Sequence, residues 1–347
     1  MNAILDSQTP NVTNEPGKIL LSDWIPGEYA LRDAWFPVAL SRHVTDKPIR
    51  RFIHSQPYFL WRPRGQLEVL EFHPRDFSRL SSQAGEFTGG SGRYPALERY
   101  GYVWAWYGNP ANAHEALVPH VPFLPREGGL PSWFSGTVRF DCCSDLSVEN
   151  LIDLTHADFL HANVVGDEES EHDEVTVEST SETVTMIRTV KNKTAAPVMR
   201  LFGGIKEKVQ DVRAVIHVHL RSRVALAYGR YRPGFDVPLF HPCVPVARNR
   251  CRLDFSFNLA DAPWFFRQVM PQSSYIISGQ DNLMTRPQNP RYAEPTERRD
   301  LHSRFDSPGM RYRFQMQQLA KRQAAGDYSY LPDGDPGRDV SELLGMR

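Results

Sequence analysis

Short apolar runs in the first third of the chain alternate with polar positions or end at Pro, Gly and charged residues. They occupy residues 33–40, 50–63, 66–72 and 93–110. Period-two alternation between turn residues predicts β-strands. The last run predicts a strand over Tyr102–Tyr107, closed by a Gly-Asn-Pro turn. We therefore expect a small all-β domain over residues 31–115, preceded by an N-terminal arm over residues 1–30.

A Pro-rich connector over residues 109–131 separates these runs from a longer pattern. There, alternating segments at 133–142, 176–190, 214–231 and 250–260 predict strands. Helices are predicted over residues 147–163, with Ser147 as the N-cap, and over 263–283 and 310–324. A sheet with long helices predicts an α+β domain over residues 116–330, and residues 331–347 are expected to form a surface tail.

The candidate chemistry gathers in residues 150–166, NLIDLTHADFLHANVVG. Asp153 and His156 are three residues apart and share a face if this segment is helical. His161 follows five residues later, so we expect the helix to break or bulge between the two histidines. Two imidazoles and a carboxylate favour a mononuclear non-haem iron(II) site, provided that a second carboxylate comes from elsewhere. The alternative is that these are ordinary helix residues.

Composition and charge exclude several other classes. The net charge of −1 and the absence of a basic cluster argue against a nucleic-acid partner. No apolar stretch is long enough for a membrane helix, and the polar N-terminus does not resemble a signal peptide. We therefore expect a cytoplasmic protein.

The four cysteines, Cys142, Cys143, Cys243 and Cys251, form no C-x-x-C, C-x-H or C-x-x-H pair. Structural zinc and iron–sulfur sites use such close pairs, so these cysteines are expected to fill the core in reduced form.

The spacing N-x-x-D-x-x-H-x-x-x-x-H, from Asn150 to His161, resembles the catalytic motif of Rieske-type non-haem iron oxygenases, in particular the vanillate-demethylase-like branch. The opening runs and the strand at 102–107 are similar as well, so the resemblance covers about residues 30–290. It implies a Rieske-like β domain followed by a helix-grip, START-like catalytic domain with an antiparallel sheet. It also implies that His156, His161 and, after Gln280, Asp281 bind mononuclear Fe(II), and that Asp153 is the catalytic residue that bridges electrons to this site.

One feature departs from the family pattern. The Rieske [2Fe–2S] cluster takes two Cys and two His ligands. Here His73 stands at the first Cys position, Arg75 stands at the first His position, and the second pair is replaced by a Ser/Gly stretch. Residues 1–141 contain no cysteine. The first domain is therefore expected to be degenerate and to bind no [2Fe–2S] cluster.

An iron site without its own cluster leaves two main hypotheses. The chain is either the catalytic component of an O2-dependent monooxygenase or demethylase, or a non-catalytic subunit of a hetero-oligomer. In the first case a Rieske-bearing subunit or reductase supplies the electrons, in a trimeric or mixed hetero-oligomer. The substrate implied is a small aromatic or heteroaromatic molecule. A third interpretation, without redox chemistry, is a pocket that binds an aromatic ligand.

Two further expectations concern the substrate pocket. Its apolar lining is expected to include members of the predicted helix at 263–283, namely Trp264, Phe265, Phe266, Val269 and Met270. His217 and His219 share one face of a predicted strand. They could line the pocket or bind metal, although a structural role in the sheet is the alternative that we favour.

Overall fold

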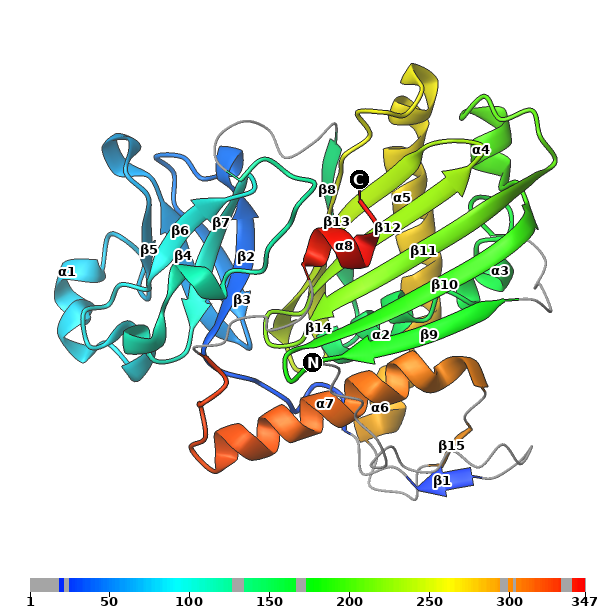
Figure 1. Cartoon of the computed structure of the whole chain (residues 1–347). Coiled ribbons are helices and arrows are strands. Elements are labelled where there is room, and N and C mark those ends of the chain that lie inside the picture. The colour runs from blue at the N-terminus through cyan, green and yellow to red at the C-terminus, as the bar shows by residue number, and fades with distance from the viewer. Residues whose placement is uncertain are drawn as a thin grey trace.

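The computed structural model describes residues 19–21, 25–126, 134–166, 173–293, 299–301, 304–331 and 339–346. Most of the predicted N-terminal arm and part of the predicted tail lie outside these ranges. A small β region stands beside a large sheet that is flanked by helices (Figure 1). The predicted α+β class is confirmed: small N-terminal sheets precede a large antiparallel sheet with long helices.

The small region contains two three-stranded antiparallel sheets, in the orders β2-β7-β6 and β3-β4-β5. Their strands are β2 (Ala34–Leu40), β3 (Ile49–Ile53), β4 (Gln56–Trp61), β5 (Glu68–Leu70), β6 (Ala96–Arg99) and β7 (Tyr102–Tyr107). All residues of β7 are buried, because one of its faces packs in this region and the other packs on the large sheet. A short helix, α1 (Phe77–Leu80), lies between β5 and β6.

The large sheet has seven antiparallel strands in the order β8-β14-β13-β12-β11-β10-β9. They are β8 (Phe134–Phe140), β9 (Glu174–Ser179), β10 (Thr183–Thr194), β11 (Val209–His219), β12 (Val224–Arg232), β13 (Asp236–Ala247) and β14 (Arg250–Phe257). Successive residues of a strand face opposite sides. Thus Val215 packs in a cluster with Trp104 and Leu344, while its neighbour Ile216 packs with Leu146 on the other face.

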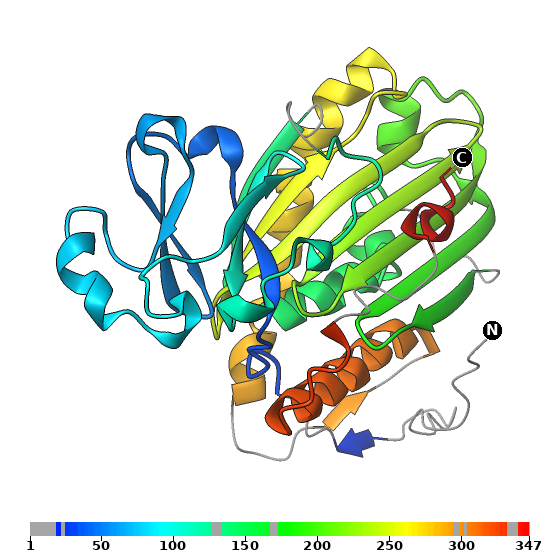
Figure 2. The same cartoon turned by 60° about the vertical axis from the view of Figure 1, so that its left-hand side comes forward.

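Helices cover the Ile216 face of this sheet. They include α2 (Ser144–Ile152), α3 (His156–Leu160) and the long α5 (Trp264–Thr285), which crosses behind the sheet in Figure 1. The helix α7 (Ser307–Ala324) packs along the β9–β10 end (Figure 2). The remaining elements are α4 (Pro197–Leu201), α6 (Gln288–Ala293), α8 (Val340–Leu344) and a strand pair of β1 (Ile19–Leu21) with β15 (Arg299–Leu301).

The predicted helices differ from the observed ones mainly near the candidate site. The helix predicted at 263–283 corresponds to α5, and the one predicted at 310–324 corresponds to α7. The helix predicted at 147–163 is two helices, α2 and α3, because the chain leaves helical geometry at Asp153. The first of them begins at Ser144 rather than after Ser147, and its N-cap is Cys143.

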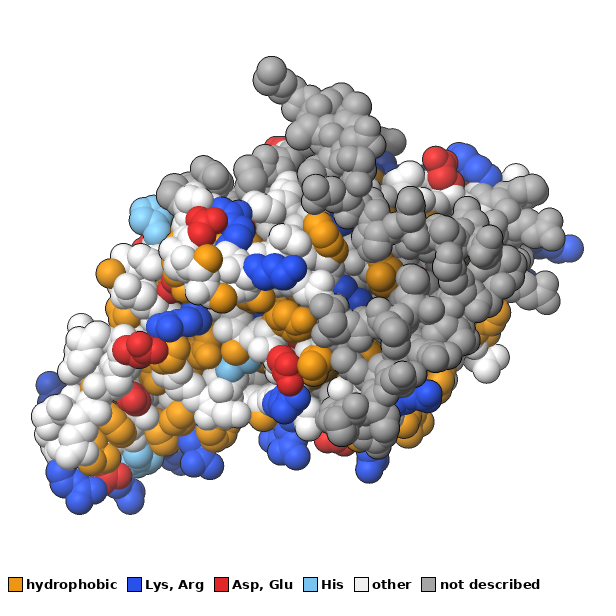
Figure 3. Space-filling view, turned by 90° about the horizontal axis from the view of Figure 1, so that it is seen from below, with side chains coloured by type: hydrophobic (Ala, Val, Ile, Leu, Met, Phe, Trp, Pro, Cys, Tyr) orange, Lys and Arg blue, Asp and Glu red, His pale blue; other side chains and the backbone are white. Residues whose placement is uncertain are grey.

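One face of the molecule shows how charged and hydrophobic side chains are distributed. On the face seen from below, basic, acidic and hydrophobic side chains of the described residues are intermixed (Figure 3). Within the described ranges, no helix is both long enough and apolar enough to cross a membrane. The four cysteines are buried free thiols.

Candidate metal centre

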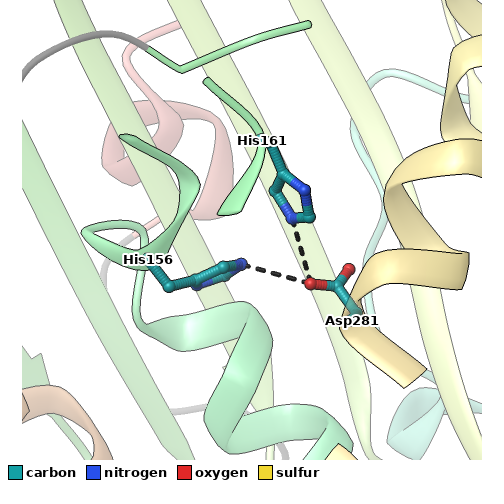
Figure 4. Close-up of side chains that lie close together, drawn as sticks. All are labelled: His156, His161 and Asp281. Atoms are coloured by element: carbon teal, nitrogen blue, oxygen red, sulfur yellow. Dashed lines mark hydrogen bonds and ion pairs between the residues drawn. The ribbon is translucent and has the colours of Figure 1, made fainter. Parts of the chain in front are cut away.

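Three side chains from two separate parts of the chain meet between the sheet and the helices. His156 begins α3, His161 directly follows its last residue, and Asp281 comes from the last turns of α5 (Figure 4). Nε2 of His161 lies 3.0 Å and Nε2 of His156 lies 3.4 Å from the same oxygen of Asp281. Among the described residues these three are the cluster of His, Cys, Asp and Glu side chains suited to holding a metal ion.

The local geometry of α3 explains how two histidines five residues apart meet. The chain breaks before His156, not between the histidines as expected from their spacing. His161 leaves the helix with φ −113° and ψ 22°, which turns its ring towards His156. Its carbonyl oxygen accepts hydrogen bonds from the amides of Val164, Val165 and Gly166. A Cβ on Gly166 would lie 2.1 Å from the carbonyl oxygen of Ala157, so only glycine permits this close return of the chain.

The Nδ1 atoms of the His156 and His161 imidazoles already have hydrogen-bond acceptors. Nδ1 of His161 donates to the side-chain oxygen of Gln280 at 2.8 Å, and Nδ1 of His156 donates to the carbonyl oxygen of Asp153. These bonds place the ring protons on Nδ1 and leave both Nε2 atoms with lone pairs facing Asp281. Two lone pairs and a carboxylate oxygen therefore converge, which is favourable around a cation.

The electrostatics of the cluster follow the same contacts. Burial opposes a charge on His156, but Asp281, helped by Asp153, outweighs it and raises the pKa of His156. Burial likewise opposes the charge on Asp281. Without a metal, a proton on Nε2 of His156 or His161 makes that ring a cation that donates to Asp281, and these contacts lower the pKa of Asp281 well below its ordinary value. Asp281 is 4% exposed, so this carboxylate is held ionised in a largely water-free position.

The carboxylate of Asp153 is held by Thr155 and not by the imidazole of His156. It accepts hydrogen bonds from the amide of Thr155 at 2.9 Å and from the Thr155 hydroxyl at 2.5 Å. The contact with the His156 imidazole is made by the main-chain carbonyl and not by the carboxylate. Asp153 and His156 both line an outer cavity of about 570 Å³, bordered by the exposed Phe159 and Met284.

An ion-pair network holds α3 against the sheet. Asp158, which is 5% exposed, pairs with Arg188 and lies 2.8 Å from the amine of Lys193, both from β10. Arg188 also donates to the carbonyl oxygen of Leu154 at 3.1 Å and pairs with Asp173. This network fixes the backbone on both sides of His156. The sequence pattern did not single it out.

An inner pocket of about 210 Å³ opens next to the cluster. Most of its lining is apolar and comes from β11 to β14 and α5, including Ile216, Leu239, Phe255, Phe257 and Met270. Such a volume suits a one-ring molecule, because a cavity of about 150 Å³ can hold benzene. His156 lines both this pocket and the outer cavity, so it lies at the boundary between them.

The expected lining from α5 was wrong for four of five residues. Met270 faces the inner pocket, but Trp264 and Phe265 are 68% and 54% exposed. Phe266 packs in the core against Phe235, and Val269 is partly buried outside the lining.

His217 and His219 lie on the sheet face opposite Ile216 and outside the candidate cluster. Nδ1 of His217 lies 2.7 Å from the hydroxyl of Thr185, and His219 lines a separate cavity.

His241 is a pocket residue that the sequence analysis missed. It comes from β13, is 7% exposed, and its Nδ1 donates to the carbonyl oxygen of Asp254 at 2.7 Å. Burial lowers the pKa of His241 despite that hydrogen bond. The neutral ring therefore carries its lone pair on Nε2. One histidine on an otherwise apolar strand gives no sequence signal that separates it from a core residue.

Comparison with known proteins identifies the family of the chain. Residues 140–322 match the family model of the vanillate O-demethylase oxygenase C-terminal domain, which is more than half of the 347 residues. The vanillate O-demethylase oxygenase subunit of Pseudomonas sp. (strain HR199 / DSM 7063) is 24% identical, over 86% of this chain and 98% of the relative. The oxygenase component of dicamba O-demethylase from Stenotrophomonas maltophilia is 29% identical, over 38% of this chain and 48% of the relative.

The fold is also that of solved oxygenases. The crystal structure of dicamba monooxygenase bound to dicamba superposes with a TM-score of 0.68 at 19% identity, covering 85% of this chain and 98% of that chain. Fold and site together define an oxygenase component of the Rieske non-haem iron class, an O-demethylase-like oxidoreductase. Within that class, the chain belongs to the vanillate O-demethylase oxygenase family.

Proposed function

We propose that this chain binds one Fe(II) through His156, His161 and Asp281 and is the catalytic component that hydroxylates or demethylates a small aromatic substrate. The observation that carries the proposal is the convergence of two Nε2 atoms and one carboxylate oxygen within 4.8 Å. This donor set is the two-histidine, one-carboxylate triad typical of non-haem iron oxygenases.

The spacing of the donor atoms fits a metal ion. Two ligand atoms at right angles, each about 2.1 Å from a metal, lie about 3.0 Å apart. The observed separations of 3.0 and 3.4 Å are close to this edge, and all three ligand atoms lie within 4.8 Å of one another, so small side-chain rotations would bring them to one metal ion. When bound, Fe(II) would supply the activation of O2. The three residues that would hold it also line the inner pocket, where a substrate would lie beside them.

The residues of the chain give this site its selectivity. The apolar wall excludes water from the pocket, and Gln280 and the Asp153 carbonyl hold the imidazoles in the tautomer that a metal requires. The Nε2 lone pair of His241 offers a hydrogen-bond acceptor in the pocket, which suits a substrate that carries a phenolic hydroxyl or another donor. Relatives whose names specify O-demethylation of vanillate and dicamba support the same substrate class.

We further propose that electrons come from a Rieske centre on a partner protein. The reason is that residues 1–141 contain no cysteine, and that His73 and Arg75 stand at the first pair of ligand positions. In the structure the His73 ring accepts a hydrogen bond from the Arg75 amide and packs on Phe59, which is an ordinary structural role. The division into a degenerate Rieske-like domain at 31–115 and a catalytic domain at 116–330 is part of this proposal.

The outer cavity is the place where such a partner would approach. Asp153 and His156 line it, and the exposed side chains of Phe159 and Met284 border it. Asp153, held by Thr155, would then sit between the partner's centre and His156. A trimer or a mixed hetero-oligomer with a Rieske-bearing subunit would supply this arrangement, as would a reductase that carries a Rieske domain.

Metal analysis and turnover test the proposal together. The purified chain, incubated with Fe(II) without oxygen and then desalted, is expected to retain about one iron per chain. Its optical spectrum is expected to lack Rieske absorption. Turnover of vanillate or a related methoxybenzoate is expected only after a Rieske-bearing partner and a reductant are added.

Three results would contradict parts of this proposal. Failure to retain iron would remove the catalytic assignment and favour a non-catalytic subunit. Rieske absorption in the isolated chain would overturn the assignment of electron supply. Iron binding without turnover, in an assembled complex whose activity survives replacement of His161, would also favour the non-catalytic role.

A further inference from the structure

A polar cleft whose lining contains none of the candidate iron ligands lies between the small β region and the large sheet. Its volume is about 560 Å³, and β2 and β3 form one side while β8 and β14 form the other. It is lined by five arginines and a histidine: Arg50, Arg51, Arg139, Arg250, Arg252 and His43. The carboxylates in its lining are Asp141 and Asp254.

Asp254 is already paired with an arginine of the cleft. Arg252, which is 8% exposed, contacts both oxygens of Asp254 at 2.9 to 3.1 Å and donates to the carbonyl oxygen of Pro37 at 2.7 Å. Asp254 also accepts a hydrogen bond from Thr137 at 2.8 Å. Nη1 of Arg252 is buried and has no hydrogen-bond partner. Asp254 therefore balances Arg252, and Asp141 is the other carboxylate in a lining that holds four further arginines.

The arginines of the cleft walls have few partners of their own. Arg51 is partly buried, and its side chain donates to the carbonyl oxygen of Arg50 at 3.0 Å. Within the described residues, Arg51, Arg139 and Arg250 form no ion pair. Burial and the neighbouring charges of Arg252 and Arg139 lower the pKa of Arg51, although Asp254 opposes them. Burial is the largest of these causes, and the two neighbouring arginines add to it.

Elsewhere the chain pairs its recessed arginines. Arg188 contacts two carboxylates, and Arg221 contacts both oxygens of Glu182. Arg223, which is fully buried, pairs with Asp145. In the cleft the buried Arg252 is paired in the same way, with Asp254. The other four arginines of its lining are exposed or partly buried and give the cleft a surplus of positive charge.

We propose that this cleft binds a small multivalent anion, most simply a phosphate-bearing molecule. Guanidinium groups present planar pairs of donors that match phosphate oxygens, so several arginines around a recess favour phosphate over a single carboxylate. The recessed position between two sheets favours a small molecule over the flat acidic surface of a protein. None of the residues that line the cleft is a proposed iron ligand.

Calorimetric titration of the full chain with pyrophosphate, at constant ionic strength, tests this proposal. We expect saturable binding that weakens as sodium chloride is raised, because added salt screens the arginine charges. Arg51→Gln and Arg139→Gln are each expected to weaken binding about tenfold, which is typical for loss of a charge-assisted hydrogen bond. The control is Arg200→Gln, which removes an exposed arginine on α4 and is expected to leave binding unchanged.

Inorganic phosphate and citrate, titrated in parallel, distinguish phosphate recognition from general attraction of anions. Stronger binding of pyrophosphate than of citrate supports the proposal. Equal binding of both, no binding up to about 10 mM, or equal weakening by all three variants would overturn it. Arg139 is exposed, so Arg139→Gln is expected to keep the melting temperature of the parent and to carry the test if Arg51→Gln does not fold.

Discussion

The metal cluster and the 71–93 segment of the small β region differ in how their polar groups are paired. In the 71–93 segment the partners lie close by: Glu71 accepts bonds from the Gly85 amide at 3.0 Å and the Thr88 hydroxyl at 3.2 Å, and Arg93 pairs with Glu68. At the metal cluster, lone pairs from two rings face a carboxylate. The first arrangement is complete without a ligand, whereas the second is favourable around a cation.

This difference separates two regions that the family pattern would both assign to iron. A segment whose donors and acceptors satisfy one another has a structural role. At the metal cluster, hydrogen bonds hold the Nδ1 atoms of both imidazoles, and the Nε2 atoms converge with a carboxylate oxygen. Such an arrangement is suited to binding a cation. The predictions below test that distinction, beginning with the largest expected effect.

Replacing one histidine in each region is the most direct test. His161→Ala removes a donor from a three-ligand set and is expected to abolish iron retention and turnover in the presence of a Rieske-bearing partner. His73→Ala removes a ring that packs on Phe59 and is expected to leave both unchanged. Iron content and product formation, measured side by side, check this prediction. Iron loss in His73→Ala would contradict the distinction.

The ion pairs behind α3 should produce the next largest effect. Asp158→Asn leaves Lys193 and part of Arg188 buried without a counter-charge, which is expected to cost about 3 kcal/mol of unfolding free energy. Iron affinity should also fall, because the backbone that carries His156 is less firmly held.

The matched control for Asp158→Asn lies on the neighbouring strand. Asp211→Asn breaks an exposed pair with Lys191 and is expected to leave stability and iron affinity nearly unchanged. Denaturant unfolding and Fe(II) titration measure both quantities. Equal effects of the two variants would show that the buried network does not support the site.

Gln280 tests whether the hydrogen bond to Nδ1 of His161 supports metal binding at Nε2 of the same ring. Gln280→Leu removes the acceptor of the His161 Nδ1 proton and is expected to reduce iron affinity about 10- to 100-fold. Gln280→Glu keeps an acceptor at the same place and is expected to retain most of the affinity. Competition with a chelator of known affinity gives both values. Equal affinity of the Leu variant and the parent would contradict the tautomer assignment.

The sequence predicted the architecture well, because strand alternation and turn residues are local signals. The observed bounds of β7 are those predicted, and the histidines of the 150–166 stretch do meet an acidic residue of α5. The break at Asp153 was misplaced, because it depends on a side-chain bond to Thr155 that competes with helical hydrogen bonding.

Contacts between distant segments account for the other differences. Residues at helical spacing show which positions of α5 are apolar, but not that Trp264 is exposed while Met270 faces the pocket. His241, the Asp158 network and the arginine cleft each depend on contacts between residues far apart in the sequence. No local sequence pattern predicts such contacts.

The smallest expected effect compares His54 of the small region with His156. His54 lies near aromatic rings, and burial, with a contribution from Arg223, lowers its pKa to about 3. Asp281 instead raises the pKa of His156. Because the folded pKa of His54 is below its unfolded value of about 6.5, the unfolded chain binds more protons and this histidine destabilises the fold as pH falls from about 6.5 towards 3.

At pH 5.5 the loss from His54 alone is expected to be about 1 kcal/mol. The His54→Asn variant should therefore lose less stability than the parent between pH 7 and pH 5.5, whatever constant cost the lost ring contacts add. Asparagine suits this test, because the residue has a φ of 46° and asparagine tolerates that region well. Urea unfolding of the metal-free proteins at both pH values gives the difference. Equal losses of stability in parent and variant would show that the pKa of His54 is not lowered. Burial would then no longer distinguish His54 from His156, whose pKa is raised by Asp281.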